Sequence, residues 1–167
     1  MDTVVIPTAR LELVLQTPDE VLAWVASLPP ADRAEVSPAW IARVRSTPAG
    51  DPWALSYTVV ERATGAAVGG CAFKGPPDAF AVVELAYGID PPHRGRGLAT
   101  EVAGALTGFA LSSGRAWMVR AHTKLDNPAS ARVLEKCGFR RVGEVIDPED
   151  GLVCRWERGP AESAAAP

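Results

Sequence analysis

The stretch 84-ELAYGIDPPHRGRGLATE-101 decides the fold of this chain. Mostly apolar residues predict a central strand over residues 81 to 89. A short loop with two glycines and two arginines follows, and from Leu98 to Leu111 apolar residues recur at the spacing of a core-facing helix. The stretch therefore predicts a strand, a glycine-rich loop and a helix in immediate succession.

The loop from Arg94 to Gly97 has the composition of an anion-binding site. Glycines let consecutive N–H groups point to one side, while the first amides of a helix lack intrahelical partners and its dipole favours negative charge. Residues 91 to 141 hold nine Lys/Arg and three Asp/Glu, although the whole chain has a net charge of -3. We therefore predict a phosphate or pyrophosphate site, to which Arg94 and Arg96 add positive charge.

Two common nucleotide motifs do not fit this loop. Thr100 stands where the third glycine of G-x-G-x-x-G is required, and no Gly-Lys-Ser/Thr follows. The pattern Arg94-x-x-Gly97-x-Ala99 instead resembles the acetyl-CoA signature, Gln/Arg-x-x-Gly-x-Gly/Ala, of the GNAT superfamily of N-acetyltransferases.

Two further segments carry the same resemblance. Asn127-Pro-Ala-Ser130, followed by residues 134 to 139 (LEKCGF), resembles the fourth helix of the GNAT family. Thr8-Ala-Arg10-Leu11 resembles the opening of the branch that acetylates ribosomal-protein N-termini on alanine. The resemblance spans residues 8 to 158.

The remaining patterns predict an α/β domain. Helices are expected from Pro18 to Ser27, in one irregular stretch up to Arg45, and from Pro128 to Gly138. The result is a mixed sheet of about seven strands with about four helices, and the resemblance implies that the fourth and fifth strands splay apart around acetyl-CoA. The expected strands are residues 10 to 16, 53 to 61, 66 to 73, 81 to 89, 116 to 122, 139 to 146 and 152 to 158.

The resemblance also implies where acetyl-CoA binds. Backbone groups of Leu85, Ala86 and Tyr87 would pair with the pantetheine and the acetyl carbonyl, and the amides of residues 95 to 99 with the pyrophosphate. The cofactor-binding set is completed by Arg94, Gly95, Arg96, Gly97, Leu98, Ala99, Thr100 and Asn127.

Direct attack of an amine on a thioester needs a base, because an alkyl ammonium has a pKa near 10.4. Glu84 is the candidate base, since it is the one charge on the central strand; Glu101 is an alternative that helix-dipole stabilisation also explains. Many relatives carry a tyrosine acid where this chain has Leu134. Ser130, one turn earlier, is therefore the candidate donor to the leaving thiolate.

Composition limits the broader class. The longest uncharged stretch, residues 102 to 114, is too short for a membrane span, and the acidic balance argues against nucleic-acid binding. Three cysteines without C-x-x-C spacing and two distant histidines favour neither disulfides nor a metal. We expect one acetyltransferase domain, residues 1 to 159, with a flexible tail, residues 160 to 167, in a cytoplasmic monomer or homodimer without a secretory signal.

The sequence is compatible with three functions. The first is acetyl transfer from acetyl-CoA to a primary amine, either a protein N-terminus or a small molecule. The second is a non-catalytic regulatory module that binds CoA with the same fold, which the missing tyrosine at Leu134 favours. The third is a binder of another phosphate ligand, such as a nucleotide-dependent transferase.

Overall fold

The computed structural model describes residues 3–160 of the 167. Apart from Pro160, the expected tail of residues 160 to 167 lies outside the described residues. In chain order the elements are β1 (Val5–Pro7), β2 (Leu11–Leu15), α1 (Pro18–Ser27), α2 (Pro30–Glu35), α3 (Pro38–Ser46), β3 (Ser56–Glu61), β4 (Ala67–Phe73), β5 (Val82–Ile89), the 3-10 helix η1 (Pro91–His93), α4 (Leu98–Ser112), β6 (Met118–Lys124), α5 (Pro128–Lys136), β7 (Arg140–Asp147) and β8 (Gly151–Arg158).

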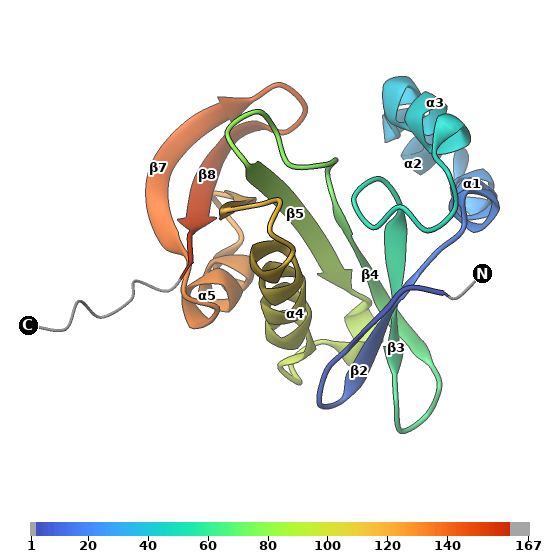
Figure 1. Ribbon diagram of the computed structural model, residues 1–167, viewed down its shortest axis with the longest axis horizontal. Coiled ribbons are helices and arrows are strands. Elements are labelled where there is room, and N and C mark those ends of the chain that lie inside the picture. The colour runs from blue at the N-terminus through green and yellow to red at the C-terminus, as the bar shows by residue number, and fades with distance from the viewer. Residues whose placement is uncertain (1–2, 161–167) are drawn as a thin grey trace, which may run out of the picture.

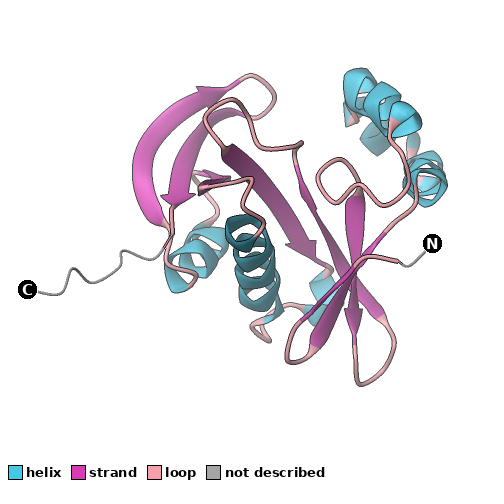
Figure 2. Ribbon diagram, in the orientation of Figure 1, coloured by secondary structure: helices cyan, strands magenta, loops and turns pink. Residues whose placement is uncertain are grey.

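The strands form one sheet in the order β1-β2-β3-β4-β5-β6-β8-β7. Neighbouring strands are antiparallel except β5 and β6, which are parallel. Helix α4 makes the long crossover that a parallel pair requires. Figure 2 shows the resulting mixture of helices and strands, which confirms the predicted α/β fold class.

Strand β5 pairs with β6 along only the first part of its length. Its first residues, Val82 to Glu84, pair with Met118 to Arg120 of β6. On its other edge β5 pairs with β4 from Leu85 to Ile89, while β6 continues along β8. The edge of β5 that faces β6 is therefore open beyond Glu84. This confirms the expected splay, which lies between β5 and β6 because a strand precedes those that were expected.

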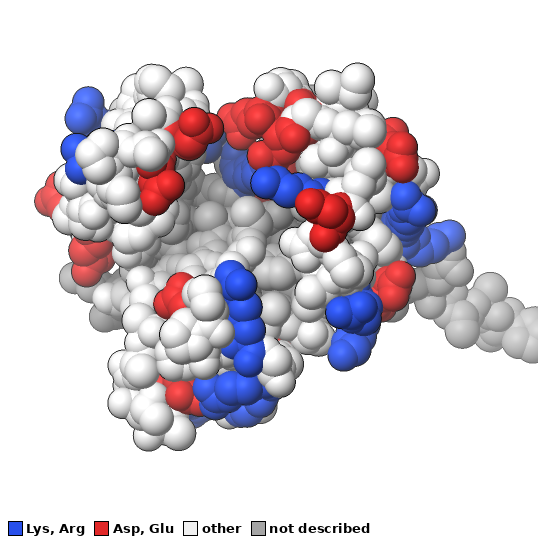
Figure 3. Space-filling model, turned by 180° about the vertical axis from the view of Figure 1, so that it is seen from behind, with Lys and Arg blue, Asp and Glu red and all other residues white. Residues whose placement is uncertain are grey.

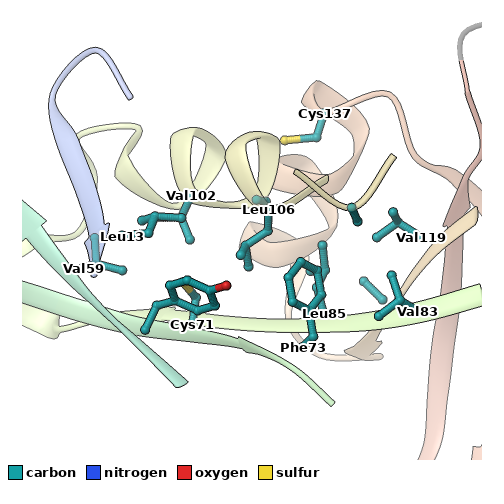
Figure 4. Packing of buried hydrophobic residues seen from close by; sticks show 14 of the residues in the cluster. Leu13, Val59, Cys71, Phe73, Val83, Leu85, Val102, Leu106, Val119 and Cys137 are labelled. Carbon is teal, nitrogen blue, oxygen red and sulfur yellow. The ribbon is translucent and has the colours of Figure 1, made fainter. Parts of the chain in front are cut away.

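The layers of the fold place α4 and α5 over one face of the sheet, whereas α1, α2 and α3 form a separate group beside β3 and β4 (Figure 1). Val102 and Leu106 of α4 point at the sheet, where Phe73 and Leu85 meet them (Figure 4). All four side chains are at most 2% exposed. This helix face is the apolar face predicted from residue spacing, and it fixes α4 against β5.

The structure corrects the element count in two places. Strand β1 was not expected, because three residues that end in Pro7 are too few to show alternation. Where one irregular helix was expected, Pro30 and Pro38 each occupy the first turn of a separate helix, and the Ser37 side chain caps the second. The sheet thus has eight strands and the described chain five α-helices.

The second expected strand, residues 53 to 61, corresponds to β3 and begins later than the sequence indicated. Trp53 and Leu55 are buried, which explains their strand-like pattern. They precede β3, because the Asp51 carboxylate accepts the Trp53 N–H at 2.8 Å and holds a turn there. The buried cluster of the described chain draws side chains from Leu11 to Trp156. The domain boundary at residue 159 stays a prediction.

Candidate active site

The glycine-rich loop turns sharply into α4. Gly95 and Gly97 both have a φ of 77°, in the left-handed region that favours glycine. Gly97 is the N-cap of α4, and no side chain among the described residues caps this helix start. The amides of the first turn are therefore available to an anion, where the helix dipole adds favourable potential.

A cavity of about 540 Å³ opens on this helix start; we call it the loop cavity. It lies between the end of β5, the loop and α5, and its basic side chains are those of Arg94, Arg132 and Lys136, with His93 beside them. The residues expected at the cofactor site that line it are Tyr87, Arg94, Gly95, Gly97, Leu98, Ala99, Thr100 and Asn127. Ser130, the candidate catalytic donor, lines it as well.

Three residues expected at the cofactor site do not line this cavity. The Arg96 guanidinium forms an ion pair with Glu61 at the end of β3, so its charge is not free as the sequence suggested. Leu85 is 2% exposed and packs in the core, and Ala86 lines a different cavity. The Ala86 backbone faces β4, because Glu84 accepts the Lys74 N–H and the hydrogen-bonded pairs recur at every second residue, which includes Ala72 and Ala86. The expected backbone role of Ala86 is therefore wrong. The backbone groups of Leu85 point to the open edge of β5, and their role stays a prediction.

Glu84 lies where β5 and β6 separate, with its side chain 22% exposed. Its Oε1 is 2.8 Å from His122 Nδ1 and 3.1 Å from Lys74 Nζ. Arg155 Nε, which can only donate, is 3.2 Å from His122 Nε2. Nε2 must therefore accept, which leaves Nδ1 protonated and donating to Glu84. Within the described chain we find no hydrogen bond to Glu84 Oε2, the oxygen free to take a proton.

Lys74 carries a positive charge next to the Glu84 carboxylate. Burial alone would lower the pKa of Lys74, but the neighbouring carboxylates, with Glu84 first, outweigh burial and raise it. Glu84, His122 and Asp147 also place ligand atoms within 4.8 Å of one another, a spacing that could suit a metal ion. The Lys74 ammonium already supplies the positive charge beside Glu84, so the carboxylate is neutralised by the protein itself.

A second cavity, of about 670 Å³, contains Glu84; we call it the carboxylate cavity. Trp24 and Trp40 from α1 and α3 line one side, and Asp147 and Glu149 from the β7–β8 turn line the other. Figure 3 shows this face hollowed between two lobes, with acidic side chains on both rims. Residues 84 and 86 face this cavity, whereas Tyr87 lines the loop cavity, as alternation along β5 requires.

Ser130 meets a partner that sequence reasoning missed. The Asn127 Oδ1 atom accepts the Ser130 N–H at 3.2 Å, which confirms Asn127 as the N-cap of α5. The Ser130 hydroxyl lies 2.9 Å from the Tyr87 hydroxyl. Burial raises the pKa of Tyr87, although the hydrogen bond with Ser130 opposes this. Leu134 is fully buried in the core, so that position directs no polar group into the cleft.

Glu101 has a structural role that the dipole argument did not predict. Its Oε1 accepts the hydroxyl of Thr8 and the Arg10 N–H, the latter at 2.7 Å, and its Oε2 is 2.8 Å from Arg10 Nε. Burial raises the pKa of Glu101, but these hydrogen bonds together lower it. With both oxygens occupied, Glu101 is not available as the base.

Arg10 joins this ion pair to the glycine-rich loop. Its Nη1 donates to the Arg96 carbonyl at 2.9 Å, and its backbone carbonyl accepts the Arg62 N–H at 2.9 Å. Arg10 thus fixes the loop to the end of β3 as well as to α4. In the sequence, Thr8 to Leu11 stood out only through the family resemblance, because the partners of Arg10 lie 86 and 91 residues away.

We expect Arg10→Ala to raise the Kd of CoA about tenfold, which corresponds to about 1.4 kcal/mol. The variant loses the bonds to Glu101 and Arg96, and the loop amides must then be ordered by the ligand. Titration calorimetry with CoA measures the effect. Arg45→Ala, which removes an exposed arginine from α3, is the control. An unchanged Kd in folded Arg10→Ala would show that the loop holds its shape without Arg10.

The family described as "Acetyltransferase (GNAT) domain" matches residues 7–140. The chain therefore belongs to the GNAT acetyltransferase family. A curated relative, the "Uncharacterized N-acetyltransferase YjdG" of Bacillus subtilis (strain 168), is 33% identical over 84 residues. That alignment spans half of this chain and half of YjdG.

Solved structures share the fold at low identity. RimL, described as a ribosomal L7/L12 alpha-N-protein acetyltransferase in complex with coenzyme A, has a TM-score of 0.70 at 18% identity and covers 93% of this chain and 98% of its own. AAC(6')-Ib in complex with ribostamycin and coenzyme A has a TM-score of 0.66 at 16% identity, covering 94% and 99%. Within residues 3–160, no helix combines the length and apolarity that a membrane crossing needs.

Proposed function

We propose that this chain is an N-acetyltransferase that transfers the acetyl group of acetyl-CoA to a primary amine by direct attack. One observation carries the proposal. The open edge of β5 borders the loop cavity on one side of the strand and the carboxylate cavity on the other. An anionic carrier and an amine can therefore meet at the point where β5 and β6 separate.

The loop cavity fits the anionic end of acetyl-CoA. The amides of Gly95 to Thr100 and the side chain of Arg94 would hold the pyrophosphate, because free N–H groups and positive charge coincide there. Arg94 is held in place by its Nε, which donates to the Ile89 carbonyl at 2.8 Å. The backbone groups of Leu85 and Tyr87, which point to the open edge of β5, would pair with the pantetheine amides. Bound acetyl-CoA supplies an activated acetyl thioester.

Glu84 is the base in this proposal. An amine in the carboxylate cavity arrives as an ammonium and must lose one proton before it can attack. Glu84 Oε1 is occupied by His122 and Lys74, so the free Oε2 takes the proton directly or through water. His122 and Lys74 hold the carboxylate in one orientation. Ser130, in the loop cavity, is the donor to the leaving thiolate.

The acceptor is proposed as a primary amine whose binding site is the carboxylate cavity. Its aromatic and acidic lining suits a cation attached to an apolar group. RimL is described as an N-terminal protein acetyltransferase, and AAC(6')-Ib was solved with ribostamycin, so both a protein N-terminus and a small molecule are reasonable acceptors. A non-catalytic CoA-binding module is the second candidate, favoured by the apolar residue at position 134.

Release of CoA thiol in the presence of acetyl-CoA and an amine panel tests the proposal. The panel contains peptides with Ala, Ser and Met N-termini, polyamines and aminoglycosides. We expect at least one amine to release thiol above the hydrolysis background and to gain one acetyl group by mass spectrometry. CoA binding by calorimetry without transfer to any amine would favour the non-catalytic module. Stabilisation by ATP or NAD but not by CoA would contradict both.

A further inference from the structure

Tyr87 and Ser130 form a hydroxyl pair across the loop cavity. Tyr87 lies on β5 and Ser130 on the first turn of α5, and their oxygens are 2.9 Å apart. Both residues line the loop cavity that also contains the glycine-rich loop. The pair therefore links the two walls between which acetyl-CoA would bind, at the residue proposed above to act on the thiolate.

Each member of the pair is held by its own element. Ser130 is fixed by the Asn127 cap, and Tyr87 is held in β5 by the antiparallel pairing of β4 and β5, where it lies opposite Cys71. A serine hydroxyl has one proton and two lone pairs, and its direction depends on its neighbours. Among the described side chains, Tyr87 is the hydrogen-bond partner of the Ser130 hydroxyl.

We propose that Tyr87 is a positioning residue whose hydroxyl donates a hydrogen bond to Ser130 Oγ and thereby directs the Ser130 O–H at the sulfur of CoA. This inference rests on the acetyl-CoA site of the proposed function. The raised pKa of Tyr87 supports this inference, because the phenol stays protonated at neutral pH and can act as the hydrogen-bond donor. Coupled hydrogen bonds of this kind strengthen one another.

The chemical step is balanced as follows. The neutral amine forms the new C–N bond and its nitrogen then loses its surplus proton to water, while the C–S bond breaks and its electron pair remains on sulfur. The Ser130 hydroxyl donates a hydrogen bond to that sulfur while Tyr87 donates to Ser130. A CoA thiol ionises near pH 8.5, far below the phenol, so Tyr87 keeps its proton and the thiolate is protonated from solvent. Ser130, oriented by Tyr87, thus takes the place of the tyrosine that many relatives have where this chain has Leu134.

A double-mutant cycle tests the pair. We expect Ser130→Ala to lower kcat about tenfold and Tyr87→Phe to lower it about threefold to tenfold, with the Kd of acetyl-CoA changed less than twofold. The double variant should be no slower than Ser130→Ala, because Tyr87 acts only through Ser130. Tyr57→Phe is the matched control: Tyr57 is the only other tyrosine, and its hydroxyl donates to the Pro52 carbonyl in the core.

A second measurement needs no amine acceptor. Ultraviolet titration of the CoA thiolate, as the difference between the complex and the free protein, gives the pKa of the bound thiol. We expect this pKa to be lowest in the wild type, highest in Ser130→Ala and between the two in Tyr87→Phe, because Tyr87→Phe keeps the Ser130 hydroxyl and loses only its orientation. This readout separates failure of the pair from failure of acetyl transfer, since a non-catalytic CoA binder would still show it.

Two results would overturn the inference. Additive losses in the double variant would show that Tyr87 acts independently of Ser130. A Tyr87→Phe variant that weakens acetyl-CoA binding, while kcat and the pKa of the bound thiol stay at wild-type values, would place the phenol in ligand binding alone.

Discussion

Glu84→Gln is expected to lower kcat/KM for the acceptor amine by about 10²- to 10⁴-fold at pH 7, which is the usual contribution of a general base. Glutamine keeps the shape of the side chain and can still accept from His122, but it cannot take a proton from an ammonium. Because Glu84 lies outside the loop cavity, the Kd of CoA should remain at the wild-type value. Steady-state kinetics and calorimetry measure the two quantities.

The pH dependence strengthens this test. At high pH a larger share of the amine is already neutral, so the difference between Glu84→Gln and the wild type should shrink. Glu149→Gln alters another carboxylate of the same cavity and should cost less than tenfold, whereas Glu144→Gln, on the exposed side of β7, controls for loss of one charge. A larger loss in Glu149→Gln than in Glu84→Gln would reassign the base to Glu149.

The features that the sequence predicted well are local ones. The glycine-rich loop, the apolar face of α4 and the Asn127 cap each depend on residues within about one or two helical turns. Such patterns place the cofactor end of the site, because an anion needs backbone amides that local turn geometry supplies. The pattern also placed Glu84 on a central strand, whereas the splay that begins there was implied only by the family resemblance.

The features that the sequence did not reveal are pairs made by the fold. Arg96 carries a positive charge that was expected to bind a phosphate, yet its guanidinium forms an ion pair with Glu61 at the end of β3. Tyr87 was assigned only through its backbone, because nothing nearby in sequence shows that its side chain reaches Ser130, 43 residues away. Single-sequence reasoning finds residue types and their faces, but the partner of a polar side chain depends on strand order and register.

The two ends of the site differ in how the chain stabilises them. The loop is held by contacts to backbone groups, such as Arg10 with the Arg96 carbonyl, and these leave its amides free. Glu84 is held by charged and polar side chains, His122 and Lys74, that leave one oxygen free. In both cases the supporting residues occupy one side of the group and leave the other without a partner among the described residues.

Gly97→Glu is expected to weaken CoA binding by at least about 100-fold, because placing a like charge against an anionic ligand costs several kcal/mol. The new carboxylate would stand at the N-cap of α4, beside the amides proposed to hold the pyrophosphate. A Cβ at this position would lie 3.5 Å from Arg10 Nη2, so the glutamate would also compete with Glu101 for Arg10. Calorimetry with CoA gives the Kd.

The backbone effect of Gly97→Glu must be separated from its charge. A non-glycine residue at a φ of +77° costs roughly 1–2 kcal/mol of stability by itself. Gly114→Glu, with a φ of +73° and open space around it beyond the far end of α4, introduces the same strain and the same charge away from the loop cavity. We expect Gly114→Glu to lose somewhat more thermal stability, because the dipole of α4 favours a carboxylate at its start and disfavours one near its end, while only Gly97→Glu loses CoA. Equal CoA affinity in these two folded variants would place the pyrophosphate site elsewhere in the molecule.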